Sequence, residues 1–419
     1  MKSHAIHFLR WSEQYTKTDM TYLIGQSGWL ILGQSAIFIS SLLLAWVFAN
    51  HVTPADYGLY KYVLSMATLA AITSLTGFGT AIARYTTKEK AISLKKLLKT
   101  QIRFGLLGTL GLFFFALYYF FLGNTLLASL FAVTAIWVPF YESLSGYQFL
   151  LQGKKDFKTQ TYLRIVQRLL LSVAVIGIIL YTKNIVIITL VYFAALTLTQ
   201  YIVYRYTMYK YPDTDDTDTP YEKIISYGKR VSVQNIFLTG ANQIDKIIMF
   251  KFLGPTQLAI YFFAIALPNE IQGVLGNINS VAFPKLVDKF SSKFKQALIK
   301  KIFLFTLLLT IPAGLYILIA PYLFTWLFPV YMSSVFISQL YIGTMLFIPA
   351  SLLWHYFYAV EHQKALWYGT FIGPSTFIIG ILVFVPLFGL IGAVLATYIR
   401  SLVDLAMALF FFFYKTKAD

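Results

Sequence analysis

Ionisable side chains lie inside long apolar runs in the second half of the sequence. Asp245 and Lys246 are adjacent, Glu270 follows, and Arg400 and Asp404 are four residues apart, a spacing that shares one face of a helix. A charge at the centre of a membrane helix costs about 2.5–3.5 kcal/mol on insertion scales. A Leu or Phe returns only about 0.3–0.6 kcal/mol. We therefore expect these side chains to face protein or water rather than lipid.

The chemistry expected of such cations is the binding of phosphate or of acidic groups. Guanidinium groups bind phosphate oxygens through paired, charge-assisted hydrogen bonds. The hypothesis is a cationic route for an anionic substrate that consists of Arg400, Lys246, Arg84, Arg164 and Arg168. The alternative is that Asp245–Lys246 and Arg400–Asp404 are structural ion pairs that hold helices together. The three arginines of the first half would then only extend to lipid headgroups at the interface.

Acidic and amide side chains of the same runs complete the candidate site. Four acids would keep the cations from binding an anion too tightly, or would take part in proton coupling. They are Asp245, Glu270, Asp404 and Glu142. The amides that would hydrogen-bond sugar hydroxyls across a cavity include Gln34, Asn235, Asn242 and Asn269. Amides of this kind equally form pairs between membrane helices, worth under about 1–2 kcal/mol each.

The sequence indicates no metal site and no cofactor. It contains no cysteine, which excludes thiolate ligands, disulfides and cysteine nucleophiles. His355 and His362 are seven residues apart, but without a third ligand they do not make a zinc site. A phosphate-binding loop of the GxxxxGK[ST] type is missing, so we do not expect this chain to hydrolyse ATP.

Composition predicts a membrane protein. The 419 residues are 58% hydrophobic and 12% charged, with a mean hydropathy of +0.68, whereas soluble domains are nearer half apolar and a quarter charged. The net charge of +17 does not indicate nucleic-acid binding, because the basic residues cluster between apolar runs rather than on one soluble face. The first run, 22–47, is too long for the apolar part of a signal peptide.

Runs of about twenty apolar residues predict membrane-spanning helices. Twelve are expected, at 22–48, 59–83, 104–122, 126–150, 162–181, 185–205, 231–252, 259–284, 302–320, 333–359, 366–385 and 391–414. The basic residues orient them, because Lys and Arg concentrate in cytoplasmic loops. Of the 34 Lys and Arg, all but five fall on one side, the exceptions being Lys61, Lys183, Lys246, Lys251 and Arg400. We therefore expect both termini in the cytoplasm.

The sequence repeats itself with an offset of 201 residues. The turn "HVTPADYGLY" at 51–60 recurs as "FLGPTQLAIY" at 252–261, which aligns Pro54 with Pro255 and Tyr60 with Tyr261. Two parallel halves of six helices place a transporter's substrate path between them. The expected domains are an N-terminal segment 1–21, a first lobe 22–205, a linker 206–226, a second lobe 227–414 and a tail 415–419.

The same stretches resemble a known family, the bacterial polysaccharide flippases of the multidrug/oligosaccharidyl-lipid/polysaccharide exporter superfamily. The first half has Pro54, Gly58 and Tyr60 in a turn, and its next helix ends in "GFGTAIAR" with Arg84. The second half has "ANQIDKIIMFKFLGPTQLAIY", and the last span begins with "FGLIGAVLATYI". Ala259 stands where the family's turn usually has Gly.

The resemblance implies an all-α, two-lobed bundle around a central cavity that opens alternately to either side of the bacterial cytoplasmic membrane. The implied substrate is a polyprenyl-pyrophosphate-linked oligosaccharide for a surface polysaccharide such as O-antigen. The implied partners are membrane lipids, a polysaccharide polymerase and a chain-length regulator, and no nucleic acid. The rival functions are an ion-coupled multidrug antiporter of the same superfamily and a membrane polysaccharide polymerase. The second rival is an enzyme and would need a large outer loop, which the sequence lacks.

Overall fold

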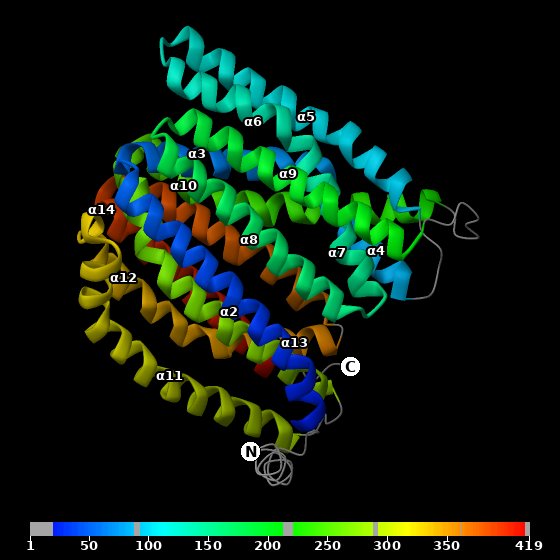
Figure 1. The fold of residues 1–419 in the computed structure, drawn as a ribbon. Coiled ribbons are helices and arrows are strands. Elements are labelled where there is room, and N and C mark those ends of the chain that lie inside the picture. The colour runs from blue at the N-terminus through cyan, green and yellow to red at the C-terminus, as the bar shows by residue number, and fades with distance from the viewer. Residues whose placement is uncertain (1–19, 88–92, 213–220, 288–291, 361, 415–419) are drawn as a thin grey trace, which may run out of the picture.

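The computed structural model describes residues 20–87, 93–212, 221–287, 292–360 and 362–414. Within these ranges the chain forms helices and no strands, which confirms the all-α prediction (Figure 1). The expected N-terminal segment and C-terminal tail lie almost wholly outside the described residues. So does 213–220 of the expected linker, whose other residues belong mainly to the ends of two helices.

The first lobe, called the N-lobe below, contains the helices from α2 to α9. Their bounds are α2 Met20–His51, α3 Pro54–Ala71, η1 Ile72–Ser74, α4 Phe78–Thr87, α5 Leu94–Phe121, α6 Thr125–Leu144, α7 Gly146–Gly153, α8 Phe157–Tyr181 and α9 Ile185–Lys210. Polar residues in the short connections cap the N-termini of several of these helices. Asn124 and Asn184, for example, accept hydrogen bonds from the first free amides of α6 and α9, as N-cap residues do.

The second lobe, the C-lobe, contains α10 to α14. Their bounds are α10 Tyr221–Val287, α11 Ser292–Leu327, η2 Pro329–Tyr331, α12 Ser334–Ile342, η3 Gly343–Ala350, α13 Ser351–Ala359 and α14 Gln363–Tyr414. The backbone leaves the helical conformation inside α10 at Gly254 and inside α14 at Gly389, both with positive φ (82° and 58°). Only glycine adopts such angles without strain, so these two residues allow the chain to reverse between apolar segments.

Nine helices of the described residues are long and apolar enough to cross a membrane, or ten if the bent pair Pro54–Ser74 and Phe78–Thr87 is one span. Two of the nine, Glu222–Gly273 and Gln363–Phe413, have 52 and 51 residues. Straight helices of that length would measure about 75–80 Å, against a hydrocarbon core of about 30 Å. The chain is a multi-pass membrane protein. The number twelve stays a prediction that requires each of these two helices to cross twice and the bent pair to form one span.

The two repeated turns pack against each other where the lobes meet. A Cβ on Gly58 would overlap the backbone carbonyl of Pro255, so close approach of the two turns requires glycine at residue 58. Nearby, the rings of Tyr57 and Phe263 are 4.9 Å apart, and those of Tyr62 and Phe250 stack at 3.8 Å. Aromatic contacts thus hold α3 of the N-lobe against α10 on both sides of Gly254. The part of α10 before Gly254 is called its first arm below, and the part after Gly254 its second arm.

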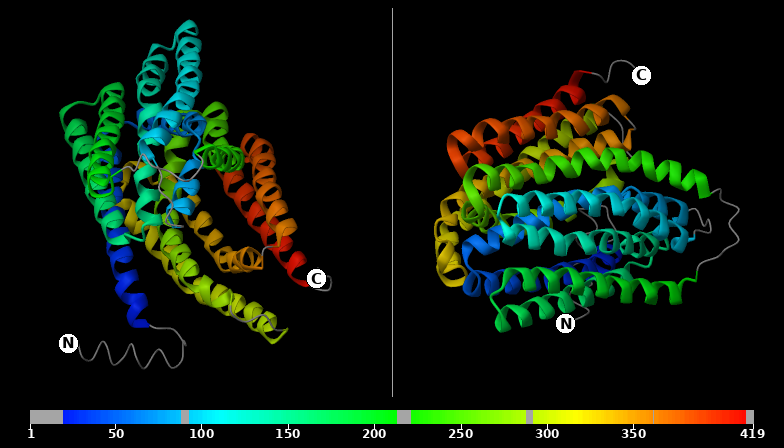
Figure 2. Two further views of the ribbon diagram at one scale, coloured as in Figure 1. Left: turned by 90° about the vertical axis from the view of Figure 1, so that its right-hand side faces the viewer. Right: turned by 90° about the horizontal axis from the view of Figure 1, so that it is seen from above.

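The first arm of α10 lies along the N-lobe as far as the bend between α3 and α4. There the Gly77 amide donates to the Ser232 hydroxyl at 3.0 Å, and Gly228 lies against the ring of Phe78. By contrast, α2, α11 and α14 spread apart toward the end of the molecule where α2 begins and α14 ends (Figure 2). The lobes therefore share one long seam along α3, α4 and α10.

Candidate functional site

Asp245 and Lys246 of α10 form an ion pair. The Lys246 Nζ is 3.0 Å from a carboxylate oxygen of Asp245, and it also donates to the backbone carbonyl of Asn242. Asp245 is buried, and its other oxygen accepts a hydrogen bond of 3.3 Å from the Tyr261 hydroxyl. The charge of Lys246 is thus compensated by its neighbour in the chain.

Arg400 of α14 is paired in a similar way. Its Nε is 3.8 Å from the Asp404 carboxylate, and the two side chains are 30% and 31% exposed. Its Nη1 donates to the side-chain oxygen of Asn242 at 3.4 Å, and its guanidinium lies 5.5 Å from the centre of the Phe377 ring. The residues Asn242, Asp245, Lys246, Arg400 and Asp404 are called the C-lobe cluster below.

Asn269 belongs to the second arm of α10 and has a partner on α12. Its side-chain oxygen accepts a hydrogen bond of 3.1 Å from the Tyr341 hydroxyl. Tyr341 in turn interacts electrostatically with Asp245 and Arg400. The structure therefore brings this predicted amide close to the C-lobe cluster.

The N-lobe presents two cations near the seam, here called the N-lobe cation pair. Arg168 of α8 donates to the Ser41 hydroxyl at 2.7 Å, and its buried Nε has no hydrogen-bond partner among the described residues. Lys61 of α3 is partly buried, with its Nζ 5.3 Å from the ring centre of Tyr57 and 4.9 Å from that of Phe262. The two positive charges interact with each other.

The Lys61 contact joins the two lobes. Phe262 is the residue that the offset of 201 aligns with Lys61, and it belongs to the second arm of α10. Because α3 belongs to the N-lobe and α10 to the C-lobe, Lys61 lies at the seam between them. Across this seam, Arg168 also interacts electrostatically with Glu270 of the C-lobe.

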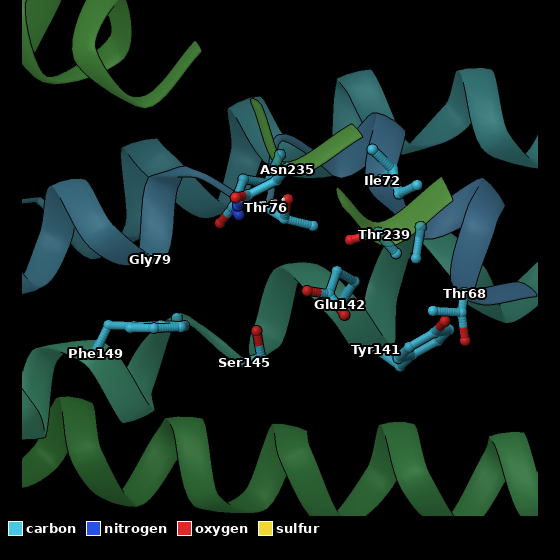
Figure 3. A pocket seen from close by; sticks show the side chains of 13 residues that line it. Thr68, Ile72, Thr76, Gly79, Tyr141, Glu142, Ser145, Phe149, Asn235 and Thr239 are labelled. Atoms are coloured by element: carbon cyan, nitrogen blue, oxygen red, sulfur yellow. Dashed lines mark hydrogen bonds between the residues drawn. The ribbon is translucent and has the colours of Figure 1, made fainter. Parts of the chain in front are cut away.

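Glu142 lies elsewhere, in a cavity of about 440 Å³ (Figure 3). This cavity, called the Glu142 cavity, is formed where η1 separates α3 from α4, where Ser145 separates α6 from α7, and where the first arm of α10 passes. Asn235 also lines it and donates to the Thr76 hydroxyl at 3.2 Å. Two predicted site residues thus meet in a place distinct from the C-lobe cluster.

The remaining predicted residues are not brought into these groups. Arg84 is exposed near the end of α4, with its guanidinium 4.7 Å from the centre of the Tyr227 ring. Arg164 is exposed one turn before Arg168 on α8. Gln34 is partly buried on α2. Arg84 and Arg164 have the exposure expected of interfacial side chains.

Lys61 is the residue of the seam that sequence reasoning missed. It lies outside the expected cytoplasmic clusters, and the expected cationic route does not contain it. Two signals would have found it. It lies within an apolar run that follows the repeated turn, and the offset of 201 pairs it with Phe262 rather than with another charge.

An ion pair outside the spans joins α8 to α9. Asp156 caps α8 and is 2.7 Å from the Lys210 Nζ. Partial burial would raise the pKa of the Asp156 carboxyl, but hydrogen bonds from Lys210, Thr159 and Tyr211 outweigh it and lower the pKa to about 2. This pair joins the N-cap residue of α8 to the last residue of α9.

Comparison with protein families gives one match over most of the chain. Residues 24–290 match the family described as "Polysaccharide biosynthesis protein". A search of curated proteins found no match.

Comparison with solved structures gives the same two-lobed fold. The lipid II flippase MurJ in an inward closed conformation superimposes with a TM-score of 0.70 at 15% identity, covering 92% of this chain and 87% of that chain. MATE in complex with MaD5 gives 0.63 at 15% identity, covering 92% and 94%. A MOP superfamily transporter from Pyrococcus furiosus, described as having a binding pocket of reverse polarity, gives 0.53 at 13% identity, covering 92% and 96%.

Proposed function

The chain belongs to the polysaccharide biosynthesis protein family, and from this premise we propose that it is a flippase for polyprenyl-pyrophosphate-linked oligosaccharides. It would move these glycolipids across the bacterial cytoplasmic membrane for assembly of a surface polysaccharide. Both termini would lie in the cytoplasm, with lobes at 22–205 and 227–414. The fold shared with a lipid II flippase supports this proposal.

The observation that carries the proposal is the N-lobe cation pair. Lys61 and Arg168 lie at the seam between the lobes, and no carboxylate lies within ion-pair distance of either among the described residues. A cation in a membrane protein without a carboxylate partner marks a substrate or ion path. A pyrophosphate offers the negative oxygens that guanidinium and ammonium groups bind most strongly.

The C-lobe cluster would act as the second half of the path. Because Lys246 and Arg400 already have carboxylate partners, a phosphate oxygen would have to compete with Asp245 or Asp404 for them. Such competition makes binding on this side weaker and more easily reversed, which a transporter needs for release. Glu270, which interacts electrostatically with Arg168, would neutralise that cation once the anion leaves.

The exposed arginines and the amides would have secondary roles. Arg84 and Arg164 would attract the anionic headgroup at the cytoplasmic end, where their charges are accessible. Gln34, Asn242 and Asn269 would hydrogen-bond the glycan along the path. The driving force would be an ion gradient or consumption of the flipped lipid outside.

A second candidate function is ion-coupled export of small molecules, because the fold is also that of MATE proteins. A carrier of cationic drugs would be expected to present carboxylates, rather than free cations, at its centre. Expression of this chain in a drug-sensitive host should therefore leave its drug sensitivity unchanged. Increased resistance would favour the antiporter.

The direct test of the flippase is deletion of the gene in its host. We expect loss of a surface polysaccharide and accumulation of lipid-linked repeat units in the inner leaflet, both reversed by the wild-type gene. Unchanged surface polysaccharide together with unchanged lipid-linked intermediates would contradict the proposal.

A further inference from the structure

The Glu142 cavity has the chemistry of a small-molecule site rather than of a packing defect. Its volume of about 440 Å³ falls within the ~300–1,000 Å³ of ligand pockets. Eight of its thirteen lining residues carry hydrogen-bonding side chains, among them Glu142, Gln101, Asn235 and Thr239. A cavity left by poor packing between membrane helices would be lined by apolar side chains.

The charge of the cavity limits what it can bind. Glu142 is its one ionisable acid, and neither Lys nor Arg is among its lining residues. Within the described chain, no ion pair or hydrogen bond joins the Glu142 carboxylate to another residue. A phosphate or an acidic sugar would therefore be repelled, whereas hydroxyl groups would find an acceptor that forms strong hydrogen bonds.

Two aromatic rings give the cavity apolar walls. The Phe149 ring lies against Gly79, where a Cβ would overlap the ring, and Tyr141 forms another part of the lining. Figure 3 shows Glu142 between Tyr141 and Ser145 on one side and Thr76 and Asn235 on the other. Carboxylate, amides and hydroxyls around a space bounded by flat rings suit the hydroxyls and the C–H faces of a sugar ring.

The cavity also lies close to the N-lobe cation pair. The Tyr141 ring is 5.7 Å from Phe193, which is 5.2 Å from Tyr192, and Tyr192 interacts electrostatically with Arg168. Three aromatic side chains in succession therefore connect the Glu142 cavity with the cation expected to hold the pyrophosphate. We expect a sugar of the glycan attached to that pyrophosphate to reach the cavity.

We propose that the Glu142 cavity binds one sugar ring that carries no negative charge. This inference rests on the proposed function and names part of its substrate. Glu142 accepts hydrogen bonds from two ring hydroxyls, Asn235 and Thr239 contribute from α10, and Tyr141 and Phe149 contact the ring faces. Affinity for a free sugar of about 1 mM is sufficient, because the attached pyrophosphate raises the effective concentration of the sugar to the millimolar range.

The test measures sugar binding without transport. Purified full-length protein in nanodiscs is probed by saturation-transfer NMR with glucose, galactose, N-acetylglucosamine, glucosamine and glucuronate. We expect at least one of the first four to bind and glucuronate not to bind. Glu142→Gln and Thr239→Val, which keep side-chain size, should each weaken binding at least about fivefold, in line with loss of one hydrogen bond. Thr134→Val, a buried change elsewhere on α6, is the matched control.

Three results would overturn the proposal: no binding by any of the four sugars, equal binding of glucuronate, or unchanged binding in both cavity variants. A pH-dependent transport defect of Glu142→Gln without any sugar binding would assign the cavity to a proton instead. The binding measurement does not depend on flipping. If the protein binds a sugar but deletion of its gene leaves surface polysaccharide and lipid-linked intermediates unchanged, the sugar site is supported and the flippase is rejected. If the protein flips the glycolipid but binds no sugar, the flippase is supported and the sugar site is rejected.

Discussion

The seam-facing sides of the two lobes use the same residue types in opposite ways. In the C-lobe, Lys246 and Arg400 each have an aspartate within 4 Å. In the N-lobe, Arg168 is held by a hydroxyl and Lys61 by two aromatic faces. Positive charge is therefore compensated on one side and available on the other.

The difference matters because a bound anion must compete with whatever already neutralises a cation. Removing one member of a buried ion pair leaves an uncompensated charge, which is strongly destabilising. Aromatic faces and hydroxyls stabilise a cation more weakly and leave several of its N–H groups free. The comparison teaches that the position of a cation within a span does not by itself identify an anion site. The partner of that cation decides whether the cation is available to bind an anion.

The largest effect is expected from Arg168→Ala. A hydrogen bond to a charged group contributes about 1.5–3 kcal/mol, so transport of lipid-linked repeat units should fall by roughly 10- to 100-fold. The measurement is flipping in proteoliposomes at matched protein amounts. Lys183→Ala, an exposed cation in the connection that follows the same helix, is the control and should retain most activity. Equal losses in the two variants would show that Arg168 contributes only general positive charge.

A smaller loss is expected from Lys61→Met, which keeps the length of the side chain and removes its charge. Because an ammonium group binds phosphate as a point charge rather than through a paired fork, we expect a decrease of about 5- to 10-fold. Lys61→Arg should restore most of the transport. If Lys61→Met transports like the wild type, then Lys61 serves only to pack between Tyr57 and Phe262.

Substitutions in the Asp245–Lys246 ion pair of the C-lobe should affect stability more than transport. Lys246→Met leaves the buried Asp245 carboxylate without its cation, so the thermal unfolding midpoint in detergent should fall. Asp245→Asn combined with Lys246→Met removes both charges and should recover most of that loss. Transport per folded molecule should stay within about threefold of wild type in the double variant. A loss as large as that of Arg168→Ala would erase the contrast between the lobes.

Sequence alone predicted the helical class, the repeat and the positions of the apolar segments, because these depend on composition and periodicity along the chain. It also offered both C-lobe pairs as the alternative to a cationic route, since Asp245–Lys246 and Arg400–Asp404 are close in sequence. It could not show that Asn242 joins the two pairs, or that Arg168 interacts with Glu270, because these contacts link distant segments. The Glu142 cavity depends on two helix breaks and on α10 passing beside them, which no local pattern specifies.

The smallest effect concerns an ion pair of the N-lobe that lies away from the seam. The pKa of Asp156 is lowered from 3.8 to about 2, so its ionised form is favoured in the folded protein. This stabilisation is present above about pH 4 and is lost as the pH falls toward 2. Because Lys210 is exposed, the contribution is small. In detergent, Asp156→Asn should slightly lower the unfolding midpoint at pH 7 and leave transport unchanged. A large transport defect would mean that helix ends at this pair take part in the cycle.

The contrast between the lobes is tested most directly by binding of a polyprenyl pyrophosphate without glycan to the purified protein in nanodiscs. The affinity should fall at least about tenfold, or about 1.4 kcal/mol, when Lys61→Met and Arg168→Ala are combined. It should fall less than about threefold when Lys246→Met and Arg400→Ala are combined. Stronger loss from the C-lobe variant than from the N-lobe variant would contradict the account.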